Sequence, residues 1–260
     1  MKECQVNECD FTQENSLWFN IVGGVISKNF GKRNIQVHLC EDEGSIKSLI
    51  KEFVGTHPDI KTIAFSDGVT LYQLNLFDWV RDEFRGYKVL QPLRRLKDGR
   101  YYSFKDYEMG EFLPQEEYDK VINEWYEGCR QALLSDLFII SANAITLHGE
   151  IVSVDGLGNR VSGMIFGPRH VLVVVGRNKV VTDVDAAQNR IRNYVAPMTF
   201  IRHNTKHHTN FTDLPCLSIG KCADCSQPQS ACRDIVIIRG QNKRHKDRIH
   251  IALINQNLGF

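Results

Sequence analysis

The chain has 260 residues, enough to bury one large α/β core or two smaller ones. With 42% apolar and 24% charged residues and only 7 prolines, its composition excludes a largely disordered protein. Lysine and arginine number 32 against 31 acidic residues, so a net charge of +1 gives no reason to expect a nucleic acid or a membrane surface as partner. No signal peptide or bilayer-spanning apolar run is visible, and we expect a cytoplasmic protein.

The first half of the chain is expected to alternate strands with helices, as a parallel sheet requires. We expect residues 1–33 to form an N-terminal helical segment and residues 34–260 to form one domain. Short apolar runs predict strands at residues 35–40, 60–65 and 87–90. Apolar residues at helical spacing predict helices at residues 45–54 and 70–84.

An insertion at residues 92–113 interrupts this alternation, because its basic residues are interleaved with tyrosine and phenylalanine. Such a mixture occurs in proteins that stack on nucleic acid, but the neutral net charge favours a solvated insertion or a lid. Pro114 then opens a helix that we expect to run to Leu134.

The second half is richer in strand. Apolar runs predict strands at residues 136–141, 150–154, 170–175, 234–238 and 248–254, and a helix is expected at residues 183–195. We interpret the basic link Arg239–Arg248 as a hairpin loop between the last two strands. The fold class expected is α/β, with a mixed, mainly parallel sheet and helices on both faces.

Four cysteines crowd into the loop PCLSIGKCADCSQPQSAC near the C-terminal end: Cys216, Cys222, Cys225 and Cys232. Thiolates at this density indicate a structural zinc ion or an iron–sulfur cluster. The spacing matches neither paired zinc knuckles nor the ferredoxin run, and we favour an iron–sulfur cluster, of the 4Fe–4S type, over zinc. Four reduced thiols, or a CxxC disulfide switch, remain the alternatives.

Residues 142–168, ANAITLHGEIVSVDGLGNRVSGMIFGP, place glycines and a few polar side chains between apolar strands. Glycines let backbone N–H groups approach a ligand, while Asn, Thr and Arg donate to carboxylate or phosphate. A simple β-turn at Asp155-Gly156 explains the glycines equally well.

This block, the run VLVVVGRNKVV, the helix DVDAAQNRIRNYVAPM and the cysteine loop together resemble the lactate-utilisation (LUD) domain family, in particular the branch with a cysteine-containing tail. The resemblance implies the fold class of sugar-phosphate isomerases, CoA transferases and a folate cyclo-ligase. It also implies a link to iron–sulfur-dependent lactate oxidation. The family's phosphate-loop-like turn corresponds to residues 66–71, where this chain has Gly68 in place of a serine.

Candidate site residues follow from these patterns. We expect His148 as general acid or base, Glu150 as a carboxylate nucleophile and Asp155 as a further catalytic residue. For several of these a plain structural role competes with the functional one. The candidates for substrate binding are Thr70, Asn143, Thr146, Gly156, Gly158, Asn159, Arg160, Asn178 and Lys179.

The function expected is participation in the utilisation or oxidation of a small hydroxy- or oxo-acid such as lactate, with a metal or an iron–sulfur cluster. An acyl-CoA or folate-type transferase or ligase is the alternative enzyme, and a metal-stabilised scaffold the alternative without catalysis. Expected partners are a small organic acid or another anionic ligand, iron–sulfur oxidoreductase subunits, and a second copy of the chain.

Overall fold

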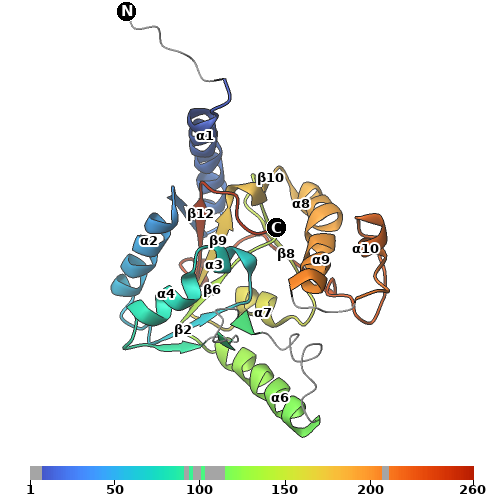
Figure 1. Cartoon of the computed structure of the whole chain (residues 1–260). Coiled ribbons are helices and arrows are strands. Elements are labelled where there is room, and N and C mark those ends of the chain that lie inside the picture. Colours follow the sequence, from blue (N-terminus) through green and yellow to red (C-terminus); the bar gives the residue numbers. More distant parts are fainter. Residues whose placement is uncertain (1–7, 91–93, 96–100, 103–114, 207–210) are drawn as a thin grey trace, which may run out of the picture.

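A six-stranded sheet, in which every pair of neighbouring strands is parallel, forms the centre of the molecule (Figure 1). The computed structural model describes residues 8–90, 94–95, 101–102, 115–206 and 211–260. The strands stand in the order β1 (Gln36–Cys40), β12 (Ile249–Ile254), β9 (His170–Gly176), β6 (Leu137–Ile140), β2 (Thr62–Phe65) and β3 (Lys88–Leu90). The α/β class expected from the sequence is confirmed.

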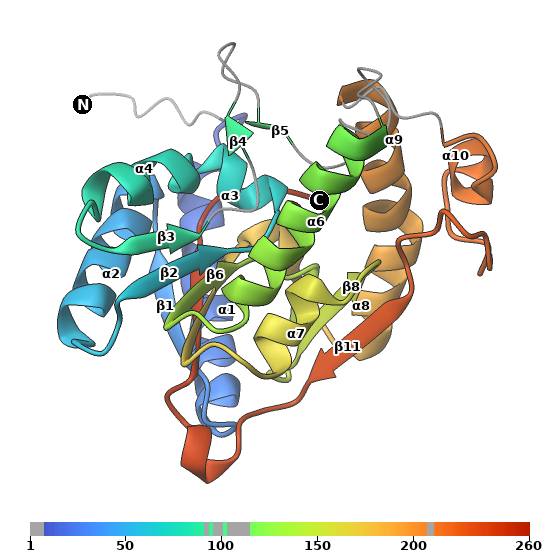
Figure 2. The ribbon, with the colours of Figure 1, turned by 90° about the horizontal axis from the view of Figure 1, so that it is seen from below.

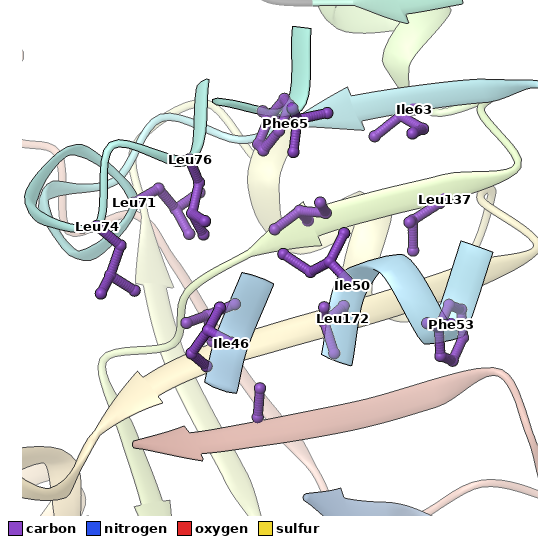
Figure 3. Close-up of a cluster of buried hydrophobic side chains, with 14 of the residues drawn as sticks. Ile46, Ile50, Phe53, Ile63, Phe65, Leu71, Leu74, Leu76, Leu137 and Leu172 are labelled. Atoms are coloured by element: carbon purple, nitrogen blue, oxygen red, sulfur yellow. The ribbon is translucent and has the colours of Figure 1, made fainter. Parts of the chain in front are cut away.

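Helices on one face of this sheet pack against alternate strand residues, since successive side chains of a strand point to opposite faces. These helices are α2 (Glu43–Thr56), α3 (Val69–Gln73) and α4 (Leu76–Glu83). Ile46, Ile50 and Phe53 line the inner side of α2 at helical spacing and meet Leu137 and Leu172 of the strands (Figure 3). Asp42 caps α2 by accepting a hydrogen bond from the backbone N–H of Ser45.

The other face is covered by α1 (Thr12–Gly31), α6 (Gln115–Ala132) and α7 (Asn159–Ile165). Gly163 permits the close approach of α7, because a Cβ there would lie 2.5 Å from the ring of Phe138 on β6. Arg248 fixes the end of the same helix by donating to the carbonyl oxygens of Gly163 and Met164, both at 2.8 Å.

A second, four-stranded mixed sheet extends this side of the molecule (Figure 2). Its strands stand in the order β10 (Val180–Val181), β7 (Ala144–Thr146), β8 (Ile151–Asp155) and β11 (Asp234–Ile238). Its outer face packs against α8 (Val184–Arg190) and the π-helical turn that follows it (Ile191–Val195), and the chain then continues into α9 (Ala196–Lys206). The prediction of a hairpin over Arg239–Arg248 was wrong, because β11 and β12 belong to different sheets.

Two predicted helices have different limits in the structure. The helix expected at 70–84 is divided into α3 and α4 by Asn75, whose left-handed backbone (φ +47°) interrupts the helical path. The helix expected at 183–195 continues through the π-helical turn into α9.

The remaining elements are short. They comprise α10 (Pro215–Ile219), 3-10 turns at Arg177–Lys179 and Lys243–His245, and the antiparallel pair β4 (Arg94–Arg95) and β5 (Tyr101–Tyr102). The rest of the predicted insertion at 92–113 lies outside the described residues. Among the described helices, none combines the length and the apolar character needed to cross a bilayer.

Candidate functional site

The topology of the main sheet changes direction between β2 and β6. From β2 the chain continues through α3 and α4 to β3, on one side, whereas from β6 it continues through β7, β8 and α7 to β9, on the other. In open α/β sheets, ligands bind at the carboxyl ends of the strands beside such a switch point. The residues that follow β2, β6 and β9 therefore mark the candidate site.

Lys179 lies buried at this edge and joins all three strand ends. Its Nζ donates to Thr70 Oγ1 at 2.8 Å, to Ser141 Oγ at 3.0 Å and to the carbonyl oxygen of Ala142 at 3.1 Å. The lysine is only 4% exposed, and burial is the main reason why its pKa falls from 10.5 to about 7. The structure thus brings together two predicted binding residues, Thr70 and Lys179, which are 109 positions apart in the chain.

Two arginines surround this lysine and lower its pKa further, first Arg190 and then Arg160. Arg190 donates to the carbonyl oxygens of Asn143 at 2.9 Å and Asn178 at 3.3 Å, and burial lowers its own pKa. Neither Lys179 nor Arg190 has a carboxylate partner among the described residues. We call Lys179, Arg190 and Arg160 the cation cluster.

Among the described residues, Asp155 is the one carboxylate that touches the cation cluster, and most of its hydrogen bonds are to backbone N–H groups. Its oxygens accept from the N–H groups of Gly156 at 2.9 Å, Arg160 at 3.0 Å and Val161 at 3.3 Å, so the side chain fixes the turn into α7. Its contact with Arg160 Nε is longer, at 3.4 Å, while Arg160 Nη2 donates to the carbonyl oxygen of Val154 at 2.8 Å.

The other predicted residues of this turn make packing contacts. Gly156 faces Ala231, where an added Cβ would come within 3.0 Å of backbone, and Gly158 has a left-handed backbone (φ +76°) beside Asp234. Asn159 reaches toward the helix α6, with its amide nitrogen 3.6 Å from the sulfur of Cys129. These contacts position the turn.

Glu150 and Thr146 lie at the far end of β7 from the Ala142 carbonyl that binds Lys179. Arg33 donates to Glu150 at 3.1 Å, and the Thr146 hydroxyl also binds this carboxylate. His148 stands exposed in the loop between them. Asn143 uses its side-chain oxygen to accept from the N–H of Val154 at 2.8 Å. The structure therefore separates the predicted acid, base and nucleophile from the cation cluster.

The segment after β12 lies across the cation cluster. Asn178 accepts from the N–H of Leu258 at 2.9 Å, and Gln73 accepts from the N–H of Gly259 at 2.6 Å. Gly259 has a left-handed backbone (φ +65°), and a Cβ there would lie 2.6 Å from Thr70 Oγ1 and 3.0 Å from Lys179 Nζ. This segment covers the lysine, and only glycine fits at its closest point.

The four cysteines lie within electrostatic reach of one another. Burial raises the pKa of Cys232 to about 11, with further contributions from Cys222, Cys216 and Cys225, and burial beside Cys225 and Cys222 raises the pKa of Cys216. The donor set suits zinc or iron–sulfur chemistry. Yet within the described part of the chain no three His, Cys, Asp or Glu residues are placed together to hold a metal ion. The chemistry of the donors fits a metal, whereas their placement does not.

Comparison with known proteins settles the family. The LUD domain model matches residues 24–254. The chain belongs to the LUD domain family. This confirms the resemblance seen in the sequence motifs. No curated protein matches it. Among solved structures, a DUF162 family protein from Deinococcus radiodurans is 9% identical, with a TM-score of 0.46 over 91% of this chain and 97% of that one.

Three residues at this candidate site were not among the predicted ones: Ser66, Ser141 and Arg190. Ser66 and Ser141 each directly follow a strand, so their position at the carboxyl ends of β2 and β6 was available as a signal. The hydroxyl of Ser66 is buried and has no hydrogen-bond partner in the described structure. Arg190 carried no such signal, since it reads as an outward-facing charge on a helix.

Proposed function

We propose that this LUD domain protein binds a small hydroxy- or oxo-carboxylate, such as lactate, at the cation cluster, and takes part in its utilisation or oxidation. The observation that supports this is the excess of positive charge at the switch point. Three cations converge there, and the single carboxylate in contact with them in the part of the chain that the structure describes, Asp155, accepts from three backbone N–H groups. An anionic ligand would balance that charge.

The chemistry of the cluster suits a carboxylate with an adjacent oxygen. Arginine binds carboxylate oxygens through two parallel N–H donors, and lysine supplies a compact charge. The hydroxyl groups of Ser66, Ser141 and Thr70 supply donors and acceptors for a hydroxyl or carbonyl group next to the carboxylate. Because Lys179 is buried, contact with it requires the segment around Gly259 to shift.

Isothermal titration calorimetry tests the proposal, with lactate and pyruvate as ligands and lactamide, which lacks the charge, as negative control. Lys179→Met removes a charged hydrogen-bond donor, and we expect it to weaken binding about tenfold or more. Arg177→Met is the matched control, because Arg177 lies on the same 3-10 turn but binds Asn255 and Asn257.

Two results would contradict the proposal. One is the absence of binding by the wild type to either acid. The other is an equal loss in Lys179→Met and Arg177→Met, which would show that local charge rather than this lysine matters. A bound carboxylate also raises the pKa of Lys179, so wild-type binding near pH 7 takes up a proton. The measured enthalpy should then change with the ionisation enthalpy of the buffer.

The acyl-transfer alternative receives no support from the position of Glu150. A carboxylate nucleophile must be free to attack, whereas Glu150 is bound by Arg33 and the Thr146 hydroxyl. Incubation with a CoA thioester and mass spectrometry for an acyl adduct on Glu150 distinguishes this alternative. A non-catalytic scaffold would bind neither the acid nor CoA thioesters.

We propose further that the four cysteines take up an iron–sulfur cluster, or zinc, when their loop closes around it, and that iron–sulfur oxidoreductase subunits are partners. Support comes from the soft donors on one loop, which lie near enough for Cys222 and Cys225 to contribute to the raised pKa of Cys216 and Cys232. Anaerobic purification, metal analysis and visible absorption test this. Colourless protein without stoichiometric metal would refute it, and Cys225→Ser should lower the metal content.

A further inference from the structure

Helix α1 has a second apolar face that points away from the protein. One face, made of Phe19, Ile26 and Phe30, is buried against the main sheet. On the other side Leu17 is 64% exposed, Trp18 45%, Ile21 70% and Val25 42%. In Figure 1 this helix stands at the upper end of the molecule, and its first turns extend beyond the strands. Several large apolar side chains exposed together on one side of a helix are typical of an interaction surface.

The exposed stripe has the spacing of a helix–helix seam. Glu14, Trp18, Ile21, Val25 and Lys28 follow one another at intervals of four, three, four and three residues, and all five are exposed. That alternation keeps side chains along one side of a helix and is the pattern of coiled-coil contacts. The stripe begins with an acid and ends with a base, each seven residues from Ile21.

We propose that α1 pairs antiparallel with α1 of a second copy of this chain, about a two-fold axis at Ile21. In such a pair a residue lying n positions before Ile21 faces the residue n positions after it on the other copy. Glu14 then faces Lys28, so the two ends of the seam are held by opposite charges. Antiparallel packing also sets the two helix dipoles in their favourable orientation.

The sizes of the facing side chains also fit this antiparallel register. Trp18, three residues before the axis, faces Gly24, three residues after it, and around Gly24 no atom lies within 4 Å of an added Cβ. The indole of each copy thus meets open space on the other. Leu17 faces Val25, an apolar pair. A different partner protein would not require the bulky and the small residue, or the acid and the base, to stand at equal distances from one central isoleucine.

Charge reversal tests the register directly, with the full chain and analytical ultracentrifugation. Glu14→Lys gives a copy with bases at both ends of the seam, and Lys28→Glu gives one with acids at both ends. For each variant alone, the dissociation constant of the dimer should rise about tenfold or more, because two attractive contacts become repulsive. An equimolar mixture of the two should restore dimers, since every base then faces an acid.

Ile21→Asp provides a second variant, which places two carboxylates against each other on the axis and should give a monomer. Ile21 is mostly exposed, so circular dichroism and thermal unfolding should show a folded chain. Asn20→Lys, an exposed position about 100° around the helix from Ile21, is the matched control and should leave the dimer intact. Monomeric wild type, or a dimer unaffected by Ile21→Asp, would overturn the proposal. Failure of the mixture to restore dimers would overturn the antiparallel pairing.

Discussion

Replacing Lys179 with methionine should change how the stability of the protein depends on pH. Burial lowers the pKa of Lys179 from 10.5 to about 7 in the folded state. The unfolded chain therefore binds more protons between these two values, and the stability of the wild type rises with pH across that window. With these values, the lysine destabilises the fold by about 4 kcal/mol at pH 7 and by about 2 kcal/mol at pH 9.

Urea unfolding of wild type and Lys179→Met at pH 7, 8 and 9 and constant ionic strength measures this. Other lysines and cysteines titrate in the same range, but their contributions cancel when the variant is subtracted from the wild type. The wild type should gain about 2 kcal/mol more than the variant between pH 7 and pH 9. Parallel pH dependence of the two proteins would show that Lys179 titrates normally, and that the buried charge is compensated by a group near it.

Three further predictions concern the fold. Burial lowers the pKa of His250 to about 4, so stability should fall as pH drops from about 6.5 to 4, by up to about 3 kcal/mol, and His250→Gln should remove this acid sensitivity in urea titrations. Gly163→Ala should destabilise by about 1–3 kcal/mol through contact with Phe138, whereas Gly55→Ala, with open space around it on α2, should stabilise slightly; equal effects would contradict the packing argument. Arg248→Met should lower the thermal midpoint by several degrees, since carbonyl groups at the end of α7 lose their donor.

The strands of the main sheet were predictable because the physical signal was local. Residues 137–140 and 171–175 are apolar at every position, and strands covered on both faces need that composition. Helix α1 was harder. Its exposed apolar residues blur the contrast between an inner and an outer face, which is the contrast that periodicity detects.

The division into two sheets was not predictable from local patterns. Residues 234–238 and 249–254 have similar apolar runs, yet the first pairs antiparallel with β8 and the second inserts between β1 and β9. Which strand each of them pairs with depends on the strand edges that the rest of the fold leaves open. The interpretation of Arg239–Arg248 as a hairpin failed for this reason.

At the candidate site, the sequence predicted side-chain contacts better than backbone contacts. The motif block at residues 142–168 suggested side-chain ligands. Two predicted binding residues outside the block, Thr70 and Lys179, do meet at the switch point. The block itself contributes one of the three cations, Arg160, and the carbonyl oxygens of Ala142, Asn143 and Val154, which accept from these cations. A sequence motif does not reveal which backbone groups turn toward a neighbouring cation.

These carbonyl contacts explain how the side chains of the cation cluster can be held in place while their positive charge stays uncompensated. A carboxylate that held Arg190 or Lys179 would neutralise the charge and leave little attraction for a ligand. A carbonyl oxygen orients the same donor through its dipole but carries no net charge, so the positive potential remains directed at the strand ends. The low pKa of Lys179 results from its burial and from the two nearby arginines, with no carboxylate partner among the described residues to offset them. An anion that restores the balance is therefore expected to stabilise the fold as well as bind to it, and the two effects should disappear together in Lys179→Met.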